Sequence, residues 1–205
     1  MNTLNGLKYA LHVIVHPFDG FWDLKHEKRG NLKASAVFLV LLLVMLILRH
    51  QLTGFIFNDY KPEDINFVSE ALNILIYFFL WCIANLAVST LIDGKGQFRD
   101  IVMVTAYSLL PIILLNIPML IISHVITLEE AALYTVLDGI SVFWAALLLF
   151  IGTKTIHHFQ LLKTVVFVLI TILCMAIIAF LALLFLSLVQ QMYNFVRLIY
   201  LELTM

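Results

Sequence analysis

The sequence has little charge for its length. Asp, Glu, Lys and Arg make up 12% of its 205 residues, whereas about a quarter is usual in soluble domains. Hydrophobic residues make up 63% and the mean hydropathy is +1.05, so the composition excludes a water-soluble globule. The net charge of −1 provides no large basic surface, and we therefore expect no nucleic acid partner.

Cysteine and proline are also scarce. The two cysteines, Cys82 and Cys174, lie inside apolar runs, which excludes a framework of extracellular disulfides and predicts two small buried side chains. Two of the four prolines lie in a single apolar run. No internal repeat is visible in the sequence.

Five apolar runs are each long enough to cross a bilayer. Hydrocarbon about 30 Å thick requires about 20 helical residues, and a backbone in lipid must satisfy its own hydrogen bonds. The runs lack the alternation of barrel strands. The sequence therefore predicts an all-α polytopic membrane protein with a five-helix transmembrane bundle. The expected spans are 31–53, 70–92, 101–126, 133–152 and 161–189.

The distribution of Lys and Arg predicts the orientation. Nine lie in the segments on the N-terminal side of the bundle and three on the opposite side. Because these residues favour the cytoplasm, we expect a cell-membrane protein with a cytoplasmic N-terminus and an extracellular C-terminus. The chain divides into a cytoplasmic interfacial segment (1–30), the transmembrane domain (31–189) and an outer C-terminal extension (190–205). The extension either prolongs the fifth helix or lies in the interface.

A short amphipathic helix is expected at the N-terminus, lying on the membrane surface. His16-Pro17 marks its end, because the residue before a proline is disfavoured in a helix. Aromatic residues suited to the headgroup layer follow. We expect Pro17, Phe18, Phe21 and Trp22 to form an interfacial anchor; a surface that docks a partner is the alternative.

The third span is unusual because it contains Pro111 and Pro118. They are seven residues apart and share nearly one helix face, and they free the carbonyls of Tyr107 and Leu114. We expect two kinks or breaks in this span. The freed carbonyls either form a polar site with Asn116 at membrane depth or are satisfied by neighbouring polar side chains.

Polar side chains inside the spans are candidate functional residues. Arg49, near the outer end of the first span, and Asp138, in the outer part of the fourth, lie at similar heights. Because an unpaired charge at such depth is costly, we predict that they pair and fix the packing of the helices; an ion relay is the alternative. Asn85 and Asn116 complete this set, and His124 is a weaker member.

No constellation for metal binding or catalysis can be assembled. His12 and His16 share a helix face and His157 and His158 are adjacent, but neither pair has a Cys or carboxylate at ligand spacing. We expect all four to be interfacial. The sequence also lacks His-Glu-x-x-His and Gly-x-Ser-x motifs. It therefore predicts no enzyme, no metal and no cofactor.

The turn between the second and third spans carries a family resemblance. Asp93, Gly94, Lys95 and Gly96 open a segment that leads into Tyr-Ser-Leu-Leu-Pro at 107–111. This pattern resembles the Gly-rich turn and Tyr-x-x-x-Pro span of the Yip-domain family, the Ypt/Rab-interacting membrane proteins. Residues 16–25 resemble the pre-membrane segment of bacterial, Firmicutes-type members. The glycines are expected to permit a tight reversal, with the turn held at the cytoplasmic face by basic residues that attract anionic lipid.

The resemblance covers roughly residues 8–190 and implies five spans and a membrane adaptor. Eukaryotic members are similar to adaptors for prenylated small GTPases, but GTPase binding is not expected here because a long cytosolic N-terminal region is lacking. Bacterial members look like accessory proteins, for which the permease subunits of sugar-uptake ABC transporters are one candidate partner.

Two functions are compatible with these features. The first is a non-enzymatic adaptor or assembly factor that contacts the bilayer and another membrane protein, with small residues on the fifth span permitting close helix packing. These residues are Ala176, Ala179 and Ala182. The alternative is a small transporter, channel or lipid-moving protein that uses the broken third span.

Five crossings predict that the two chain ends are accessible from opposite sides of the membrane. Single cysteines at Asn2 and Thr204, introduced after replacing Cys82 and Cys174 with serine, are labelled with a membrane-impermeant maleimide. We expect labelling at 204 in intact cells and at 2 only after lysis. Labelling of both positions in the same compartment would contradict the number of spans.

Overall fold

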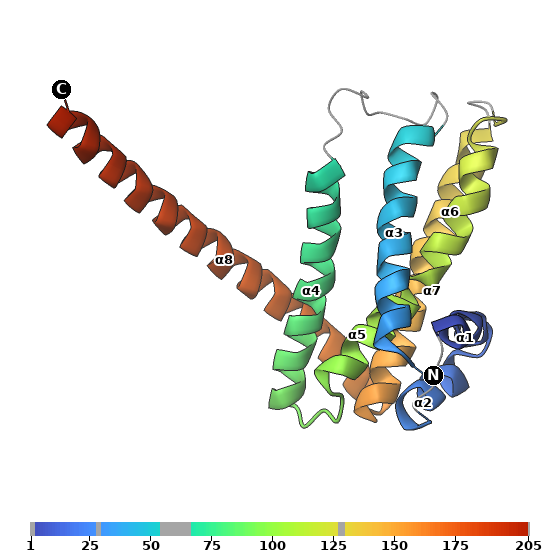
Figure 1. Cartoon of the computed structure of the whole chain (residues 1–205). Coiled ribbons are helices and arrows are strands. Elements are labelled where there is room, and N and C mark those ends of the chain that lie inside the picture. Colours follow the sequence, from blue (N-terminus) through green and yellow to red (C-terminus); the bar gives the residue numbers. More distant parts are fainter. Residues whose placement is uncertain (1–2, 28–29, 54–66, 127–129, 205) are drawn as a thin grey trace.

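The described part of the chain folds entirely into helices. The computed structural model describes residues 3–27, 30–53, 67–126 and 130–204, and no strand occurs among them. This confirms the all-α class. The helices are α1 (Thr3–Val15), α2 (Pro17–His26), α3 (Leu32–Leu52), α4 (Phe67–Leu91), α5 (Phe98–Ser108), α6 (Leu110–Ile122), α7 (Ala131–His157) and α8 (Leu161–Thr204). Figure 1 shows α1 and α2 at one end of an upright bundle from which α8 departs.

Five helical runs are long and apolar enough to cross a membrane, which confirms the predicted number: α3, α4, α5 with α6, α7, and α8. The limits of α3 agree with the sequence, because Asn31 caps the helix by accepting a hydrogen bond from the Lys33 amide at 3.0 Å. The fourth span continues past the predicted end at 152 to His157, and the fifth continues to Thr204. The C-terminal extension therefore prolongs the fifth helix.

The third span is the centre of the bundle. Its most apolar stretch is 61% buried, against 11–33% in the other four spans. It consists of two helices, because α5 ends at Ser108 and Pro111 lies in the first turn of α6. The break lets α5 pack among α3, α4 and α7, while α6 packs on α3 and α7. The two segments run in different directions in Figure 1.

Only one of the two prolines breaks this span. Pro118 lies inside the continuous helix α6, so it does not break the span, and no second interruption occurs between 110 and 122. Its ring is on the exposed side of α6. Proline is tolerated in a transmembrane helix where neighbouring side chains and local backbone adjustments satisfy the freed groups.

Side chains of α5 form much of the core. Tyr107 is fully buried and its ring lies edge-on to Phe38, with the centroids 5.0 Å apart. The hydroxyls of Thr105 and Ser108 donate to the carbonyls of Ile101 and Val104, both at 2.8 Å. Polar side chains can therefore be buried here because they bond to the carbonyl one turn earlier.

The N-terminal helices pack onto the bundle as well as facing outward. α1 buries Gly6, Ala10 and Val13, and the Tyr107 hydroxyl donates to the Gly6 carbonyl at 3.4 Å. α1 ends at Val15, where the His16-Pro17 signal placed its end. Pro17 begins the next helix, α2, as proline does at a first helical position.

The interfacial anchor of residues 17–22 is partly wrong. Phe21 is 0% exposed and belongs to the core, whereas Phe18 and Trp22 are 58% and 49% exposed. The reason is that these residues form the helix α2, which directs its side chains to two opposite sides. Phe18 and Trp22, four residues apart, share the outer face, and Phe21 and Leu24 share the inner one.

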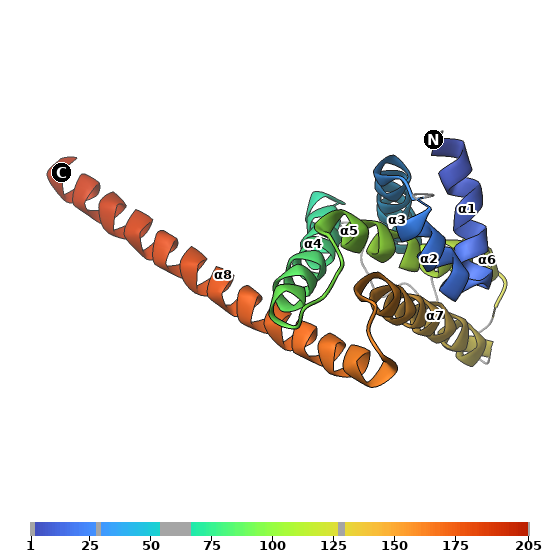
Figure 2. The same cartoon turned by 90° about the horizontal axis from the view of Figure 1, so that it is seen from below.

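α8 leaves the bundle after its first turns. Phe167 packs with Val88 and Phe159 in a small cluster between α8 and α4. Every residue from Phe180 to Glu202 is exposed. Figures 1 and 2 show the distal half of α8 pointing away from the other helices, with the C-terminus at the end of the bundle opposite to α1 and α2.

Two glycines of α7 provide a test of this packing. A Cβ atom at Gly152 would overlap Val104 Cγ1 and lie 3.2 Å from the Phe21 ring, whereas one at Gly139 would meet nothing within 4 Å. Both changes to alanine favour helix formation by about 1 kcal/mol. We expect Gly139→Ala to be neutral or stabilising and Gly152→Ala to lower stability by about 1–3 kcal/mol. Thermal unfolding in detergent measures both; equal melting temperatures would contradict the packing of α5 and α2 against α7.

Candidate functional site

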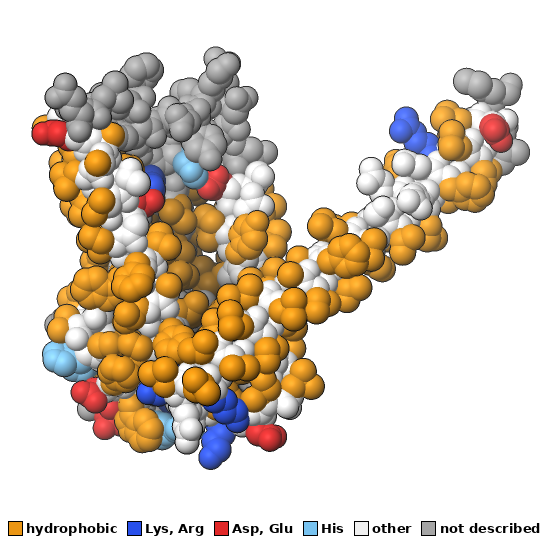
Figure 3. Space-filling model, turned by 180° about the vertical axis from the view of Figure 1, so that it is seen from behind, with side chains coloured by type: hydrophobic (Ala, Val, Ile, Leu, Met, Phe, Trp, Pro, Cys, Tyr) orange, Lys and Arg blue, Asp and Glu red, His pale blue; other side chains and the backbone are white. Residues whose placement is uncertain are grey.

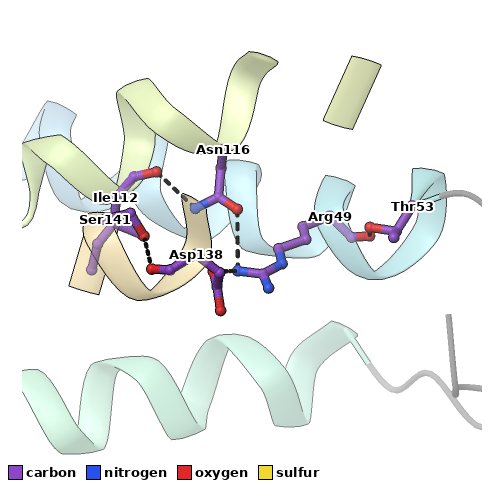
Figure 4. A network of polar contacts seen from close by, with 6 residues as sticks. All are labelled: Arg49, Thr53, Ile112, Asn116, Asp138 and Ser141. Carbon is purple, nitrogen blue, oxygen red and sulfur yellow. Dashed lines mark hydrogen bonds and ion pairs between the residues drawn. The ribbon is translucent and has the colours of Figure 1, made fainter. Parts of the chain in front are cut away.

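Three polar side chains from three helices meet in the half of the bundle farther from α1 and α2. Arg49 Nη1 of α3 lies 2.6 Å from Asp138 Oδ1 of α7 and donates to Asn116 Oδ1 of α6 at 3.2 Å. Asn116 Nδ2 in turn donates to the Ile112 carbonyl at 2.7 Å. Figure 4 shows this network. The predicted contact between Arg49 and Asp138 is present, with Asn116 as a third member.

Local features of α3 and α7 hold this network in place. Arg49 is in the last turn of α3, where a positive charge is favourable to the helix dipole. Its guanidinium carbon lies 5.9 Å from the centre of the Tyr134 ring, one turn before Asp138, within the range of a cation–π contact. The arrangement joins three spans through charge-assisted hydrogen bonds.

Two residues grouped with this network by the sequence lie apart from it. The ring of His124 contacts the Leu120 carbonyl, with Nδ1 at 2.9 Å. Asn85 hydrogen-bonds His157, the last residue of α7, near the turn between α4 and α5. The intramembrane polar residues therefore form two separate sites, and Asn85 does not join Arg49, Asn116 and Asp138.

A cleft lies beside the network, between α4 on one side and α3 and α7 on the other. Its volume is about 440 Å³, and the α5–α6 break contributes to its lining. The walls are apolar apart from Arg49, Asp138, Thr105 and Ser141. Figure 3 shows the hollow from behind, between two columns of hydrophobic side chains. The volume is within the range of small-molecule sites.

The second polar site is at the turn between α4 and α5. Gly96 N–H donates to His157 Nδ1 at 3.2 Å, and His157 Nε2 lies 3.0 Å from Asn85 Oδ1. Because Nδ1 accepts, the ring must carry its proton on Nε2, which donates to Asn85. The neutral imidazole thus joins α4, the turn and α7.

The glycines of this turn are required by close approach. A Cβ at Gly94 would lie 2.6 Å from His157 Nδ1, and one at Gly96 would lie 2.7 Å from His157 Cε1. Neither glycine has a positive φ; Asp93 adopts the left-handed conformation instead, with φ 55°. Asp tolerates this region better than most residues. The predicted tight turn is present, but its glycines serve to seat an imidazole.

Lys25 of α2 closes the same end of the bundle. Its ammonium donates to the carbonyl of Lys95, at 3.3 Å, and to that of Ile156. Burial lowers the pKa of Lys25, an effect opposed by the nearby Asp100 carboxylate and reinforced by Lys95. The turn is therefore bound to α2 and α7 through its backbone, while the Lys95 side chain itself is exposed.

Aromatic and imidazole rings surround the end of α7. The rings of Trp22 and His26 stack with their centres 3.9 Å apart, and His158 meets both edge-on. Partial burial lowers the pKa of His158, and the positive charges of Lys25, His26 and Lys95 lower it further. This surface fits a headgroup layer, where rings with one apolar and one polar side are favoured.

No group of three or more His, Cys, Asp or Glu that could hold a metal occurs in the described part of the chain. The rings of His12 and His16 stack at 5.1 Å. His157 is buried rather than interfacial, which corrects the expectation for this residue.

Sequence reasoning missed the residues that depend on contacts between helices. These are His157 as the hub of the turn, Lys25 as a backbone clamp, and the cleft with Trp81 in its wall. A histidine next to another histidine at the end of a span gives no sign of which one is buried. Two glycines in one turn indicate that another part of the protein approaches its backbone closely. They do not show which residue approaches.

The five apolar runs, the buried polar contacts and the turn define a multi-pass α-helical membrane protein. The family model of the Yip1 domain matches residues 11–195. The chain therefore belongs to the Yip1 domain family, which confirms the resemblance seen in the turn. Comparisons with curated proteins and with solved structures give no match.

The ion pair predicts coupled effects on stability. Asp138→Asn and Arg49→Gln each remove one partner of a charge-assisted bond, and we expect each to lower stability by about 1.5–3 kcal/mol. The double variant should lose less than the sum, because the second change no longer breaks the pair. Arg197→Gln, on the exposed part of α8, is the control and should change little. Additive losses in detergent unfolding would contradict a direct interaction.

Proposed function

We propose that this protein is a non-enzymatic adaptor or assembly factor that acts through helix–helix contacts with another membrane protein. Membership of the Yip1 domain family supports a role of this type. The proposal places the protein in the cell membrane, with the N-terminus in the cytoplasm, on the basis of the Lys and Arg distribution. No catalytic role is assigned to any residue.

The observation that carries this proposal is the unpacked distal half of α8. The helix has 44 residues, about 66 Å at 1.5 Å per residue, roughly twice the thickness of the hydrocarbon layer. A helix serving only to cross the hydrocarbon would end near residue 189, and the contacts of α8 with the bundle end near Thr171, its last fully buried residue. Between Thr171 and residue 189 the helix offers a largely apolar surface to a partner within the bilayer.

The small and polar side chains of the distal helix favour a protein partner over lipid alone. The exposed face begins near Ala176, Ala179 and Ala182, where small side chains permit close approach of a second helix. Beyond 189 the helix carries Gln190, Gln191, Asn194, Arg197 and Glu202. Such polar side chains are unfavourable against hydrocarbon and favourable against another protein or water. A transport complex, with the permease subunits of an ABC transporter as the candidate partner, is the specific setting that we propose.

A transporter that uses the third span is supported by one observation, the contact of Arg49, Asn116 and Asp138 beside a cleft. It is opposed by the mostly apolar walls of this cleft and by the continuity of α6 through Pro118. A hydrophilic solute would find few polar partners along these walls. We therefore favour the adaptor.

Photo-crosslinking tests the adaptor directly. A photoreactive amino acid is placed at Phe185 in the distal part of α8 in the full-length protein, and native membranes are irradiated. We expect a discrete adduct with a multi-span membrane protein, identified by mass spectrometry. Ala182→Trp, which blocks close helix approach, should reduce this adduct several-fold.

The matched control is the same photoreactive residue at Val136 of α7, which is exposed to a similar degree but lies outside α8. This position should give lipid adducts and no discrete protein band. If Phe185 also yields lipid adducts only, α8 has no protein partner and the adaptor is contradicted. A discrete partner that is unrelated to transport would retain the adaptor and exclude the transport complex.

A further inference from the structure

We propose that the cleft between α4 and α7 binds one phospholipid with a zwitterionic, primary-ammonium headgroup, and that Arg49 and Asp138 recognise this headgroup. The proposal concerns α3, α4 and α7 and is independent of any partner of α8. It begins from the shape of the cleft. The rim includes Tyr77 and Val142, which are 65% and 53% exposed, so the cleft opens sideways from the bundle.

The position of the opening determines which molecules can reach it. Tyr77 and Val142 lie within transmembrane spans, so the opening faces hydrocarbon rather than water. A molecule that enters must already be dissolved in the bilayer. The inner walls are formed by aliphatic and aromatic side chains such as Leu46, Ile74 and Phe78, which suit an alkyl chain.

The charged end of the cleft is only partly satisfied by the protein. Arg49 Nη1 is bonded to Asp138 and to Asn116, and the Tyr134 hydroxyl is a further partner of the guanidinium. The side chains of Arg49 and Asp138 nevertheless remain 28% and 33% exposed. In Figure 4 the second terminal nitrogen of Arg49 and the second carboxylate oxygen of Asp138 point away from α6 and toward α4. Both residues line the cleft. An ion pair at membrane depth is stabilised by additional hydrogen bonds to its remaining donors and acceptors.

The signs of these two groups select the headgroup. A phosphate accepts hydrogen bonds from a guanidinium, and a primary ammonium donates to a carboxylate. A phosphoethanolamine group supplies both at once. A phosphocholine group has no N–H to donate to Asp138, and a phosphoglycerol group brings a negative charge without a cation to pair with this carboxylate.

A second unsatisfied group lies in the same wall. The indole N–H of Trp81 is buried and has no hydrogen-bond partner among the described residues, and Trp81 lines the cleft. A buried donor without an acceptor is unfavourable. An ester oxygen of a bound lipid would provide the acceptor. Hydrocarbon chains alone have no acceptor.

Native mass spectrometry of the full-length, delipidated protein tests this proposal. The probes are phosphatidylethanolamine, phosphatidylcholine and phosphatidylglycerol with identical acyl chains, added separately in detergent. We expect one phosphatidylethanolamine to bind about tenfold more tightly than the other two, as one additional charge-assisted hydrogen bond implies. Asp138→Asn should remove most of this preference.

Because Asp138→Asn also lowers the stability of the protein, a second variant that keeps the ion pair is tested. Val142→Trp fills the rim of the cleft and should reduce the bound lipid about tenfold. Val136→Trp, on the same helix, similarly exposed and outside the cleft, should bind as the unmodified protein does. Equal binding of the three lipids, or undiminished binding by Val142→Trp, would show that only surrounding bilayer lipid is retained and would overturn the proposal.

Discussion

A polar group inside this bundle is favourable only where it has a hydrogen-bond partner, because the surrounding hydrocarbon offers none. This constraint explains the arrangement of the buried polar residues. Hydroxyls of Thr105 and Ser108 return to carbonyls of their own helix, whereas longer polar groups bond to other helices. The contacts between helices that give the bundle its shape are therefore those that also satisfy charge and hydrogen bonding.

The two ends of the bundle meet this constraint in different ways. At the end near the N-terminus, His157 is bonded on both ring nitrogens, and Lys25 is bonded to two backbone carbonyls. This end is closed by α1 and α2 and contains the turn that resembles the Gly-rich turn of the family. In the opposite half, Arg49 and Asp138 pair beside an open cleft. In the open half, we propose that an external molecule completes the contacts.

The break at Pro111 lies between these two halves and determines how the third span packs in each. It allows one span to pack in two directions, so α5 fills the closed end while α6 brings Asn116 to Arg49. Because α5 and α6 diverge, a cleft remains beside α4. α8 then packs only on the lower part of the bundle through Phe167 and leaves its distal part free. The same fold thus provides a lateral cleft and a projecting helix, which are suited to a lipid and to a protein partner respectively.

The sequence alone determined the surrounding solvent, the number of spans and the limits of α3, because hydropathy and capping are properties of a continuous segment. It also predicted the contact of Arg49 with Asp138, since two opposite charges at one depth have few other partners. Tertiary structure alone decided that Phe21 and His157 are buried, that Asn85 lies apart from Asn116, and that a cleft exists. In a soluble helix the apolar face shows which side is buried, but helices in lipid are apolar on all sides. Which face of each span meets another helix is therefore determined only when the helices pack.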